Sequence, residues 1–170
     1  MNKIGLLASS LFVAATLAVA PAASAAYYFL VTADGIDGES IAKGEEKAIQ
    51  ASAFSLSMRV PVSASGQASG KRQYSAATFT KKFGKASPQL WQNAALSKAL
   101  KSVKIEFSQT AAGVSSVYDT VTLTNVTVTG ITRRASSGGE LEDVSLSFQK
   151  IEIADDTSIF SDNIATATVQ

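Results

Sequence analysis

Three acidic residues lie close together near the N-terminus, at Asp34, Asp37 and Glu39 in the segment DGIDGE. Carboxylate oxygens in such a loop are the ligands that calcium prefers, so a cation site is one interpretation. The spacing of an EF-hand loop is absent, however, and Asp-Gly pairs are typical of tight turns that bind nothing. We therefore expect a turn at this position and no metal site.

The residue types needed for most hydrolytic mechanisms are missing, because the chain contains no histidine and no cysteine. A Ser-His-Asp triad, a histidine general base and the usual zinc ligand sets are thereby excluded. An enzyme would have to use a carboxylate pair such as Asp155 and Asp156, yet adjacent residues in a weakly patterned segment are poorly placed for acid–base catalysis. The sequence predicts a protein that is not an enzyme and that needs no cofactor.

Charge is balanced along the chain, with 15 basic residues against 14 acidic ones. Basic pairs at 71–72, 81–82 and 133–134 are matched by acidic residues at 45–46 and within 140–143. Such balance favours a solvated surface, with contacts between identical subunits as a second interpretation. We expect no nucleic-acid partner, because no long-range positive field would attract one.

Residues 1–25 predict a secretory signal peptide. Lys3 precedes an apolar run from Ile4 to Ala20, and Ala23-Ser24-Ala25 matches the small-residue cleavage pattern. A membrane anchor is the alternative, but the run is shorter than the ~20 residues that span a bilayer. We expect cleavage after Ala25, export to the periplasm or the extracellular medium, and no membrane contact by the remaining chain.

The elements that position these residues are expected to be mostly β-strands. Apolar and polar residues alternate from Phe54 to Val60, from Val103 to Phe107 and from Val144 to Phe148, so each apolar set is expected on one inward face. Near Asn125 the inward parity changes by one residue, which predicts a β-bulge or a bend. About seven short strands separated by turns predict a mainly β fold, either a compact antiparallel barrel or two packed sheets.

One segment departs from the strand pattern. Ser87 can cap the N-terminus of a helix, and Pro88 suits the first helical position. Leu90, Trp91 and the alanines that follow give a broad apolar face. We expect one side helix from Ser87 to about Leu100 that lies against the sheet, with Trp91 in the core.

Two other stretches lack clear periodicity. Residues Pro61–Arg72 are small, polar and rich in glycine and serine, which predicts a long mobile loop. Residues 154–170 are weakly patterned and predict either a final strand or a tail. The expected organisation is therefore a signal peptide at 1–25, one β-domain at 26–153 and a C-terminal strand or tail at 154–170.

Five segments together carry a resemblance to a known family. They are GIDGES at 35–40, AFSLSM at 53–58, ATFTKKFGKASPQLWQNA at 77–94, VTLTNVTVTGI at 121–131 and LEDVSLSFQKIEI at 141–153. In this order and spacing they resemble the Hcp family, the tube protein of type VI secretion, over nearly all of Tyr27–Ile153, and FTKKFGKASPQL is the most specific part.

The resemblance implies a compact β-barrel of two packed sheets with one side helix. It also implies self-association into hexameric rings that stack into a hollow tube, whose lumen can hold small protein cargo. The loop 61–72 lies where proteins of this family extend an arm toward the next ring. The stacking contacts that the resemblance implies are Ser65, Gly66, Gly70, Lys71 and Arg72.

Two functions remain open at this point. The first is an exported Hcp-like structural protein that forms rings or tubes, in the periplasm or outside the cell. The second is a monomeric secreted binding module or effector that uses the same barrel, because a fold does not determine a function.

Overall fold

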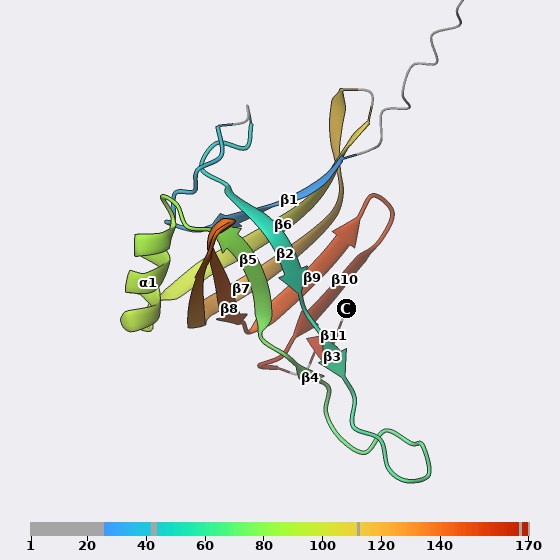
Figure 1. The fold of residues 1–170 in the computed structure, drawn as a ribbon. Coiled ribbons are helices and arrows are strands. Elements are labelled where there is room, and N and C mark those ends of the chain that lie inside the picture. The colour runs from blue at the N-terminus through green and yellow to red at the C-terminus, as the bar shows by residue number, and fades with distance from the viewer. Residues whose placement is uncertain (1–25, 42–43, 112, 167, 170) are drawn as a thin grey trace, which may run out of the picture.

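The computed structural model describes residues 26–41, 44–111, 113–166 and 168–169 (Figure 1). The signal peptide predicted for 1–25 lies outside these residues. Within the described chain the elements follow one another as β1 (Ala26–Ala33), β2 (Ile49–Ser55), β3 (Met58–Arg59), β4 (Gln73–Tyr74), β5 (Ala77–Lys82), α1 (Ser87–Ala95), β6 (Ala99–Ala111), β7 (Val114–Ser136), β8 (Gly139–Ser147), β9 (Lys150–Asp155), β10 (Ile159–Asn163) and β11 (Thr168–Val169).

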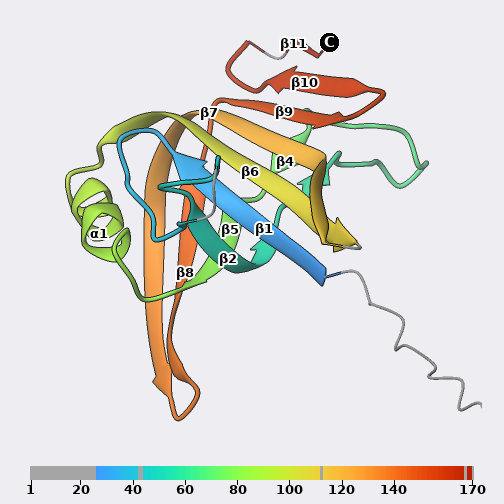
Figure 2. The same ribbon diagram turned by 90° about the horizontal axis from the view of Figure 1, so that it is seen from above.

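The described strands form a nine-stranded antiparallel sheet that closes on itself and a separate two-stranded sheet of β3 and β4. The order of the larger sheet is β11-β10-β9-β7-β6-β1-β2-β5-β8, and an additional pairing between β7 and β8 closes a barrel. Closure depends on the length of β7, which pairs with β6 over Val114–Thr127 and with β8 over Thr127–Ser136. Figure 2 shows the barrel strands enclosing the interior, with β9 and β10 lying outside it beside β7. The predicted mainly β fold with one side helix is confirmed.

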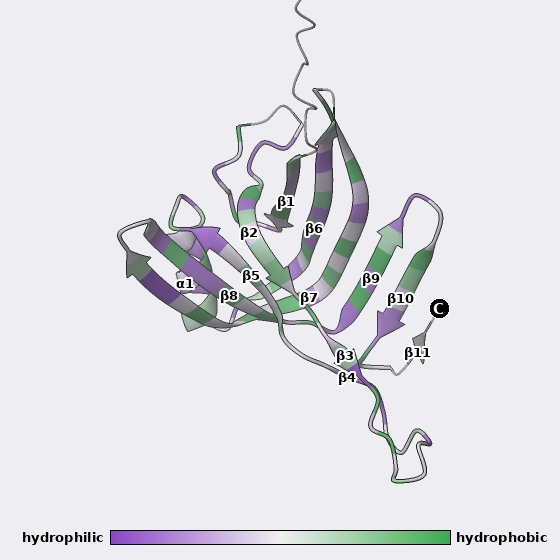
Figure 3. Ribbon diagram, turned by 45° about the vertical axis from the view of Figure 1, so that its right-hand side comes forward, coloured by the Kyte–Doolittle hydropathy of each residue, from purple (hydrophilic) through white to green (hydrophobic). Residues whose placement is uncertain are grey.

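The core lies inside this barrel and follows the predicted alternation. Figure 3 shows apolar and polar residues alternating along β6 and β7. Val103 and Ile105 are fully buried on β6, and Val144 and Leu146 are fully buried on β8. Removing these aliphatic side chains from water is the main force that favours the closed sheet.

The predicted irregularity at Asn125 is confirmed. Its φ of 51° is positive, a conformation that Asn tolerates better than most residues. This backbone conformation shifts the alternation by one residue, so Val121 and Leu123 are buried before Asn125 and Val126 is buried after it. At the same place β7 changes its neighbour from β9 to β8.

The face predicted for Phe54–Val60 is only half right. Phe54 and Leu56 pack against the core, but Met58 and Val60 are exposed. The reason is that β2 ends at Ser55, where the chain leaves the barrel. The period-two pattern continues past the strand end, so parity alone does not reveal where burial stops.

The helix is shorter than predicted. α1 ends at Ala95, where Leu96 and Ser97 donate backbone hydrogen bonds to Gln92 and Ala94, and Ser97 has a φ of 50°. Leu100, predicted near the helix end, is a buried residue of β6. The apolar residues that suggested a longer helix therefore belong to a helix and a strand in succession.

The start of the helix also differs from the prediction by one position. Ala86 occupies the N-cap without a side-chain cap, and Ser87 is already helical. The Ser87 hydroxyl instead accepts a hydrogen bond from the Gly84 N–H and contacts charged side chains of the barrel.

Trp91, predicted in the core, is 44% exposed. A helix of nine residues at the barrel rim buries Leu90 but leaves the neighbouring Trp91 at its border.

The C-terminal residues form strands rather than a loose tail. β10 pairs with β9, and β11 pairs with the end of β10, so the sheet continues beyond the barrel. No helix within the described residues is long and apolar enough to cross a membrane.

Candidate assembly surfaces and their anchors

The segment predicted as a long loop forms a projecting hairpin, which we call the arm, residues 58–74. β3 and β4 pair at its base, Val62 and Ala68 form a bridge, and the Ser63 N–H donates to the Gln67 carbonyl at 2.8 Å. Gly66 turns the tip with a φ of 80°. The predicted loop at 61–72 thus lies between β3 and β4, and its glycines and serines form turns around the single bridge. Figure 1 shows the arm extending well away from the barrel.

The residues proposed as stacking contacts occupy three positions on the arm. Ser65 and Gly66 lie at the tip, whereas Gly70 lies against Pro61 on the opposite segment. Lys71 is exposed, and Arg72 faces the body of the molecule. The first four therefore lie on the arm surface, while Arg72 acts at its base.

A buried carboxylate holds that base. Asp162 on β10 is fully buried and receives two hydrogen bonds from the Arg72 guanidinium and one from the Tyr74 hydroxyl at 2.7 Å. The Arg72 hydrogen bonds lower the pKa of Asp162, and they outweigh the opposing effect of burial. Burial, together with the adjacent carboxylate, raises the pKa of Tyr74 to about 12. A bidentate arginine contact of this kind also fixes orientation, so the arm leaves the molecule in a defined direction.

Sequence reasoning missed Asp162. It lies 90 residues from Arg72 in a weakly patterned segment, and no local spacing signals the contact.

A second buried cluster attaches the helix to the barrel. Lys81 on β5 and Glu142 on β8 are direct cross-strand partners, and both are fully buried. The Lys81 ammonium donates to the Ser87 hydroxyl at 2.8 Å and to the Glu142 carboxylate at 3.4 Å. The Trp91 indole N–H donates to the other Glu142 oxygen at 2.9 Å. One carboxylate thus joins the sheet to two residues of α1.

The electrostatics of Glu142 follow from these contacts. Burial alone would raise the pKa of its carboxyl group, but hydrogen bonds from Ser87 and Trp91 and the charge of Lys81 lower it below the usual range. The exposed indole ring above this cluster is therefore held in place by its N–H, and it presents a rigid aromatic surface to the solvent.

Among the acidic residues considered for metal binding, Asp37 has a structural role. Asp37 forms ion pairs with Lys47 at 3.4 Å and Lys85 at 3.5 Å, and Gly35 forms the expected turn with a φ of 73°. No group of three potential ligands in the described part of the chain could hold a metal ion.

Asp155, considered as one member of a carboxylate pair, caps a turn. Its carboxylate accepts backbone hydrogen bonds from Thr157 and Ser158 at 2.7 Å, which lower its pKa to about 2.

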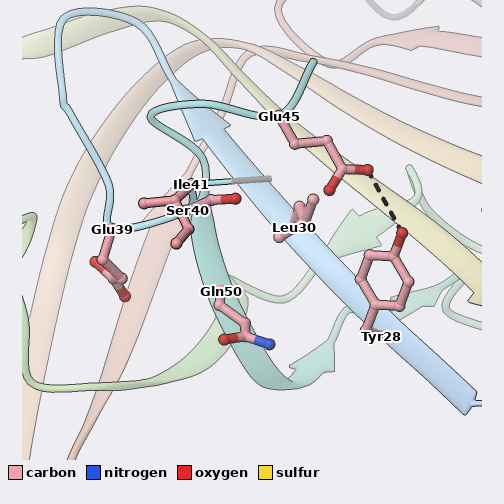
Figure 4. A pocket seen from close by; sticks show the side chains of 7 residues that line it. All are labelled: Tyr28, Leu30, Glu39, Ser40, Ile41, Glu45 and Gln50. Atoms are coloured by element: carbon pink, nitrogen blue, oxygen red, sulfur yellow. Dashed lines mark hydrogen bonds between the residues drawn. The ribbon is translucent and has the colours of Figure 1, made fainter. Parts of the chain in front are cut away.

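One pocket of about 360 Å³ lies on the outer side of β1 and β2 (Figure 4). Its lining residues are Tyr28, Leu30, Glu39, Ser40, Ile41, Glu45 and Gln50. The Tyr28 hydroxyl contacts Glu45 at 3.5 Å across it.

Comparison with protein families identifies the chain. The family model described as "Type VI secretion system effector, Hcp" matches residues 29–154. The chain belongs to the Hcp family.

Solved Hcp structures share the fold over almost their whole length. A variant of Hcp1 from E. coli EAEC 042 is 26% identical, with a TM-score of 0.73, and the match covers 81% of this chain and 97% of that one. A crystal structure titled only as Hcp protein is 25% identical, with a TM-score of 0.75 and coverage of 81% and 98%. Hcp1 from Salmonella typhimurium is 21% identical, with a TM-score of 0.74 and coverage of 85% and 99%. A comparison with curated proteins finds no match for this chain.

Proposed function

We propose that this Hcp-family protein is an exported structural subunit that forms hexameric rings, and that the rings stack into tubes. The observation that carries the proposal is the family match over residues 29–154, together with an Hcp fold that extends over nearly the whole of the solved relatives. The subunit has no catalytic task in this proposal, and the lumen of the ring accommodates small protein cargo.

An open sheet edge supports self-association. The sheet ends at β10 and β11 outside the barrel, and within the described residues β11 pairs only with Asp162 and Asn163. The remainder of β10 therefore presents a strand edge, which another copy can cover. A head-to-tail contact between identical subunits closes into a ring when the rotation between neighbours brings the last subunit back to the first. A head-to-tail contact that repeats along an axis produces a stack.

The proposed export rests on the signal pattern at 1–25. N-terminal sequencing of the protein recovered from the periplasm or the medium is expected to begin at Ala26. A mature protein that retains residues 1–25 would contradict the export proposal without affecting the ring proposal.

Electron microscopy and multi-angle light scattering of the purified protein test the assembly. We expect six-fold rings with a central opening, and at higher concentration stacks of rings. A protein that remains strictly monomeric at high concentration would refute ring formation and favour the secreted binding module.

A further inference from the structure

An apolar groove lies at the turn between β9 and β10. It encloses about 540 Å³, and its lining residues are Tyr118, Asp119, Ile153, Asp155, Ser158, Ile159 and Phe160. Four of these are large apolar side chains that are at least 36% exposed, and Ile159 is 68% exposed. Exposed apolar surface gathered in one groove is typical of a site that another surface covers.

The groove also carries two negative charges, of which Asp155 is already stabilised by hydrogen bonds from Thr157 and Ser158. Asp119 on β7 and Asp155 on β9 are direct cross-strand partners, an arrangement of like charges that destabilises a sheet. Within the described residues no lysine or arginine forms an ion pair with either carboxylate. A ligand that brings both apolar groups and a positive charge would therefore fit the groove.

The arm has the complementary surface. Met58, Val60 and Val62 are exposed on it, and Val62 is 64% exposed. Residues 56–75 contain no aspartate or glutamate, but they include Arg59 and Lys71. Neither of these two cations forms an ion pair within the described chain, and the Arg59 guanidinium donates hydrogen bonds to the Gln73 side chain. The arm thus offers aliphatic side chains and free positive charge together.

The two surfaces lie at opposite ends of the β9–β10 hairpin. Asp162, which anchors the arm, lies near the end of β10, whereas Asp155 and Ser158 form the turn at its other end. In Figure 1 the arm projects in one direction and the β9–β10 turn in the other. An arm held in this way points away from the groove of its own molecule, so its acceptor belongs to another copy.

From these observations we infer that the arm of one subunit docks into the groove between β7, β9 and β10 of a second copy. Met58, Val60 and Val62 cover the apolar lining, and Lys71 or Arg59 neutralises the Asp119–Asp155 pair. This inference rests on the proposed stacking of rings and names the surface that receives the arm. The contact is head-to-tail, so each ring offers arms on one face and grooves on the other.

Engineered disulfides test the contact directly, because the chain has no cysteine of its own. Val62→Cys and Ile159→Cys subunits, with different tags, are mixed under conditions in which the parent protein forms stacks and are then oxidised. We expect covalent dimers that contain both tags. Ile41→Cys, at an exposed position away from the groove, is the matched control and should give no dimer with Val62→Cys. Dimers with the control but none with Ile159→Cys would overturn the inference, and so would dimers that form equally in isolated rings.

Charge reversal supplies a second test that does not require oxidation. Lys71→Glu or Asp119→Lys alone is expected to weaken ring-to-ring association by about tenfold or more, because a small charge effect is multiplied around the ring. The double variant Lys71→Glu/Asp119→Lys should recover stacking. Lys101→Glu and Asp34→Lys, which reverse exposed charges elsewhere, should leave it unchanged.

The outcomes separate this inference from the proposed function. If the parent protein forms no rings or stacks, the proposed function itself fails. If it stacks, and both single reversals stack equally well, the arm docks elsewhere and only the inference is overturned. Loss of stacking in both single variants without recovery in the double variant would also contradict direct pairing.

Discussion

The buried pair Lys81–Glu142 shows how individual residues connect the sheet to the helix. Each charge was expected at the surface, because lysine and glutamate are rarely buried and the chain is electrically balanced. The strand pattern around Phe79 does not predict the burial of Lys81, because the register that places Lys81 opposite Glu142 is a property of the folded sheet. Once buried together, the two charges stabilise the fold only as a pair, because either one alone would remain uncompensated.

Lys81→Met is therefore expected to destabilise the protein by about 3–5 kcal/mol at neutral pH, the range for removing one member of a buried ion pair. Urea unfolding monitored by circular dichroism measures this cost. Lys101→Met, an exposed lysine on β6, is the control and should change stability by about 0.5 kcal/mol or less.

The pH dependence of the stability lost in Lys81→Met shows whether charge or packing is responsible. In the parent protein the pKa of Glu142 is lowered on folding, so its contribution to stability is present at neutral pH and is lost as pH falls below the ordinary glutamate range. Without the Lys81 ammonium, only the hydrogen bonds of Ser87 and Trp91 oppose burial, so the pKa of Glu142 is higher than in the parent protein. The deficit of Lys81→Met should therefore shrink between pH 7 and pH 4, and a deficit independent of pH would show that lost packing is responsible.

Trp91 shows why residue spacing within a helix was insufficient. The spacing correctly placed Leu90 on the buried face, but the burial of its neighbour depends on how far the barrel extends beneath a short helix. A local pattern determines which side chains share a face, whereas the depth of that face is a tertiary property. The cost of about 3–5 kcal/mol that accompanies truncation of a core tryptophan is consequently not expected here.

At the scale of elements, the change of parity in β7 was the most informative local signal. It predicted an irregularity near Asn125, and the structure places a positive φ there, where β7 leaves β9 and joins β8. The position of the anomaly was predictable because burial alternates strictly on either side of it. The structural role of this irregularity was not predictable, because the sequence does not show which strands will be neighbours.

Substitutions at Asn125 test this assignment. Asn125→Gly should be close to neutral, whereas Asn125→Val should destabilise the protein by about 1–2 kcal/mol, because a β-branched residue resists a positive φ. Thermal unfolding of both variants provides the comparison. Equal stability of the valine and glycine variants would mean that the backbone at 125 carries no strain.

At the scale of the whole molecule, the arm is separate from the barrel except at its base, where Tyr74 packs against Phe148 and Arg72 contacts Asp162. The barrel could be anticipated from alternating apolar residues and from the resemblance of the segments between Tyr27 and Ile153 to the Hcp family. The direction of the arm could not, because it depends on the contact between Arg72 and Asp162 across 90 residues. The same separation allows the two units to be tested independently.

Replacement of the arm is expected to leave the barrel intact and to abolish stacking. The Ser75 N–H donates to the Ser57 carbonyl at 2.9 Å, so these residues are already paired, and an Asn-Gly turn can join them in place of residues 58–74. Asp162→Asn accompanies the change, because the buried carboxylate would otherwise lose the hydrogen bonds of Arg72 and Tyr74. Circular dichroism should show a folded protein, and electron microscopy should show rings without tubes. Tubes formed by this variant would show that the arm is dispensable for stacking, whereas loss of the rings themselves would show that the arm also contributes to contacts within a ring.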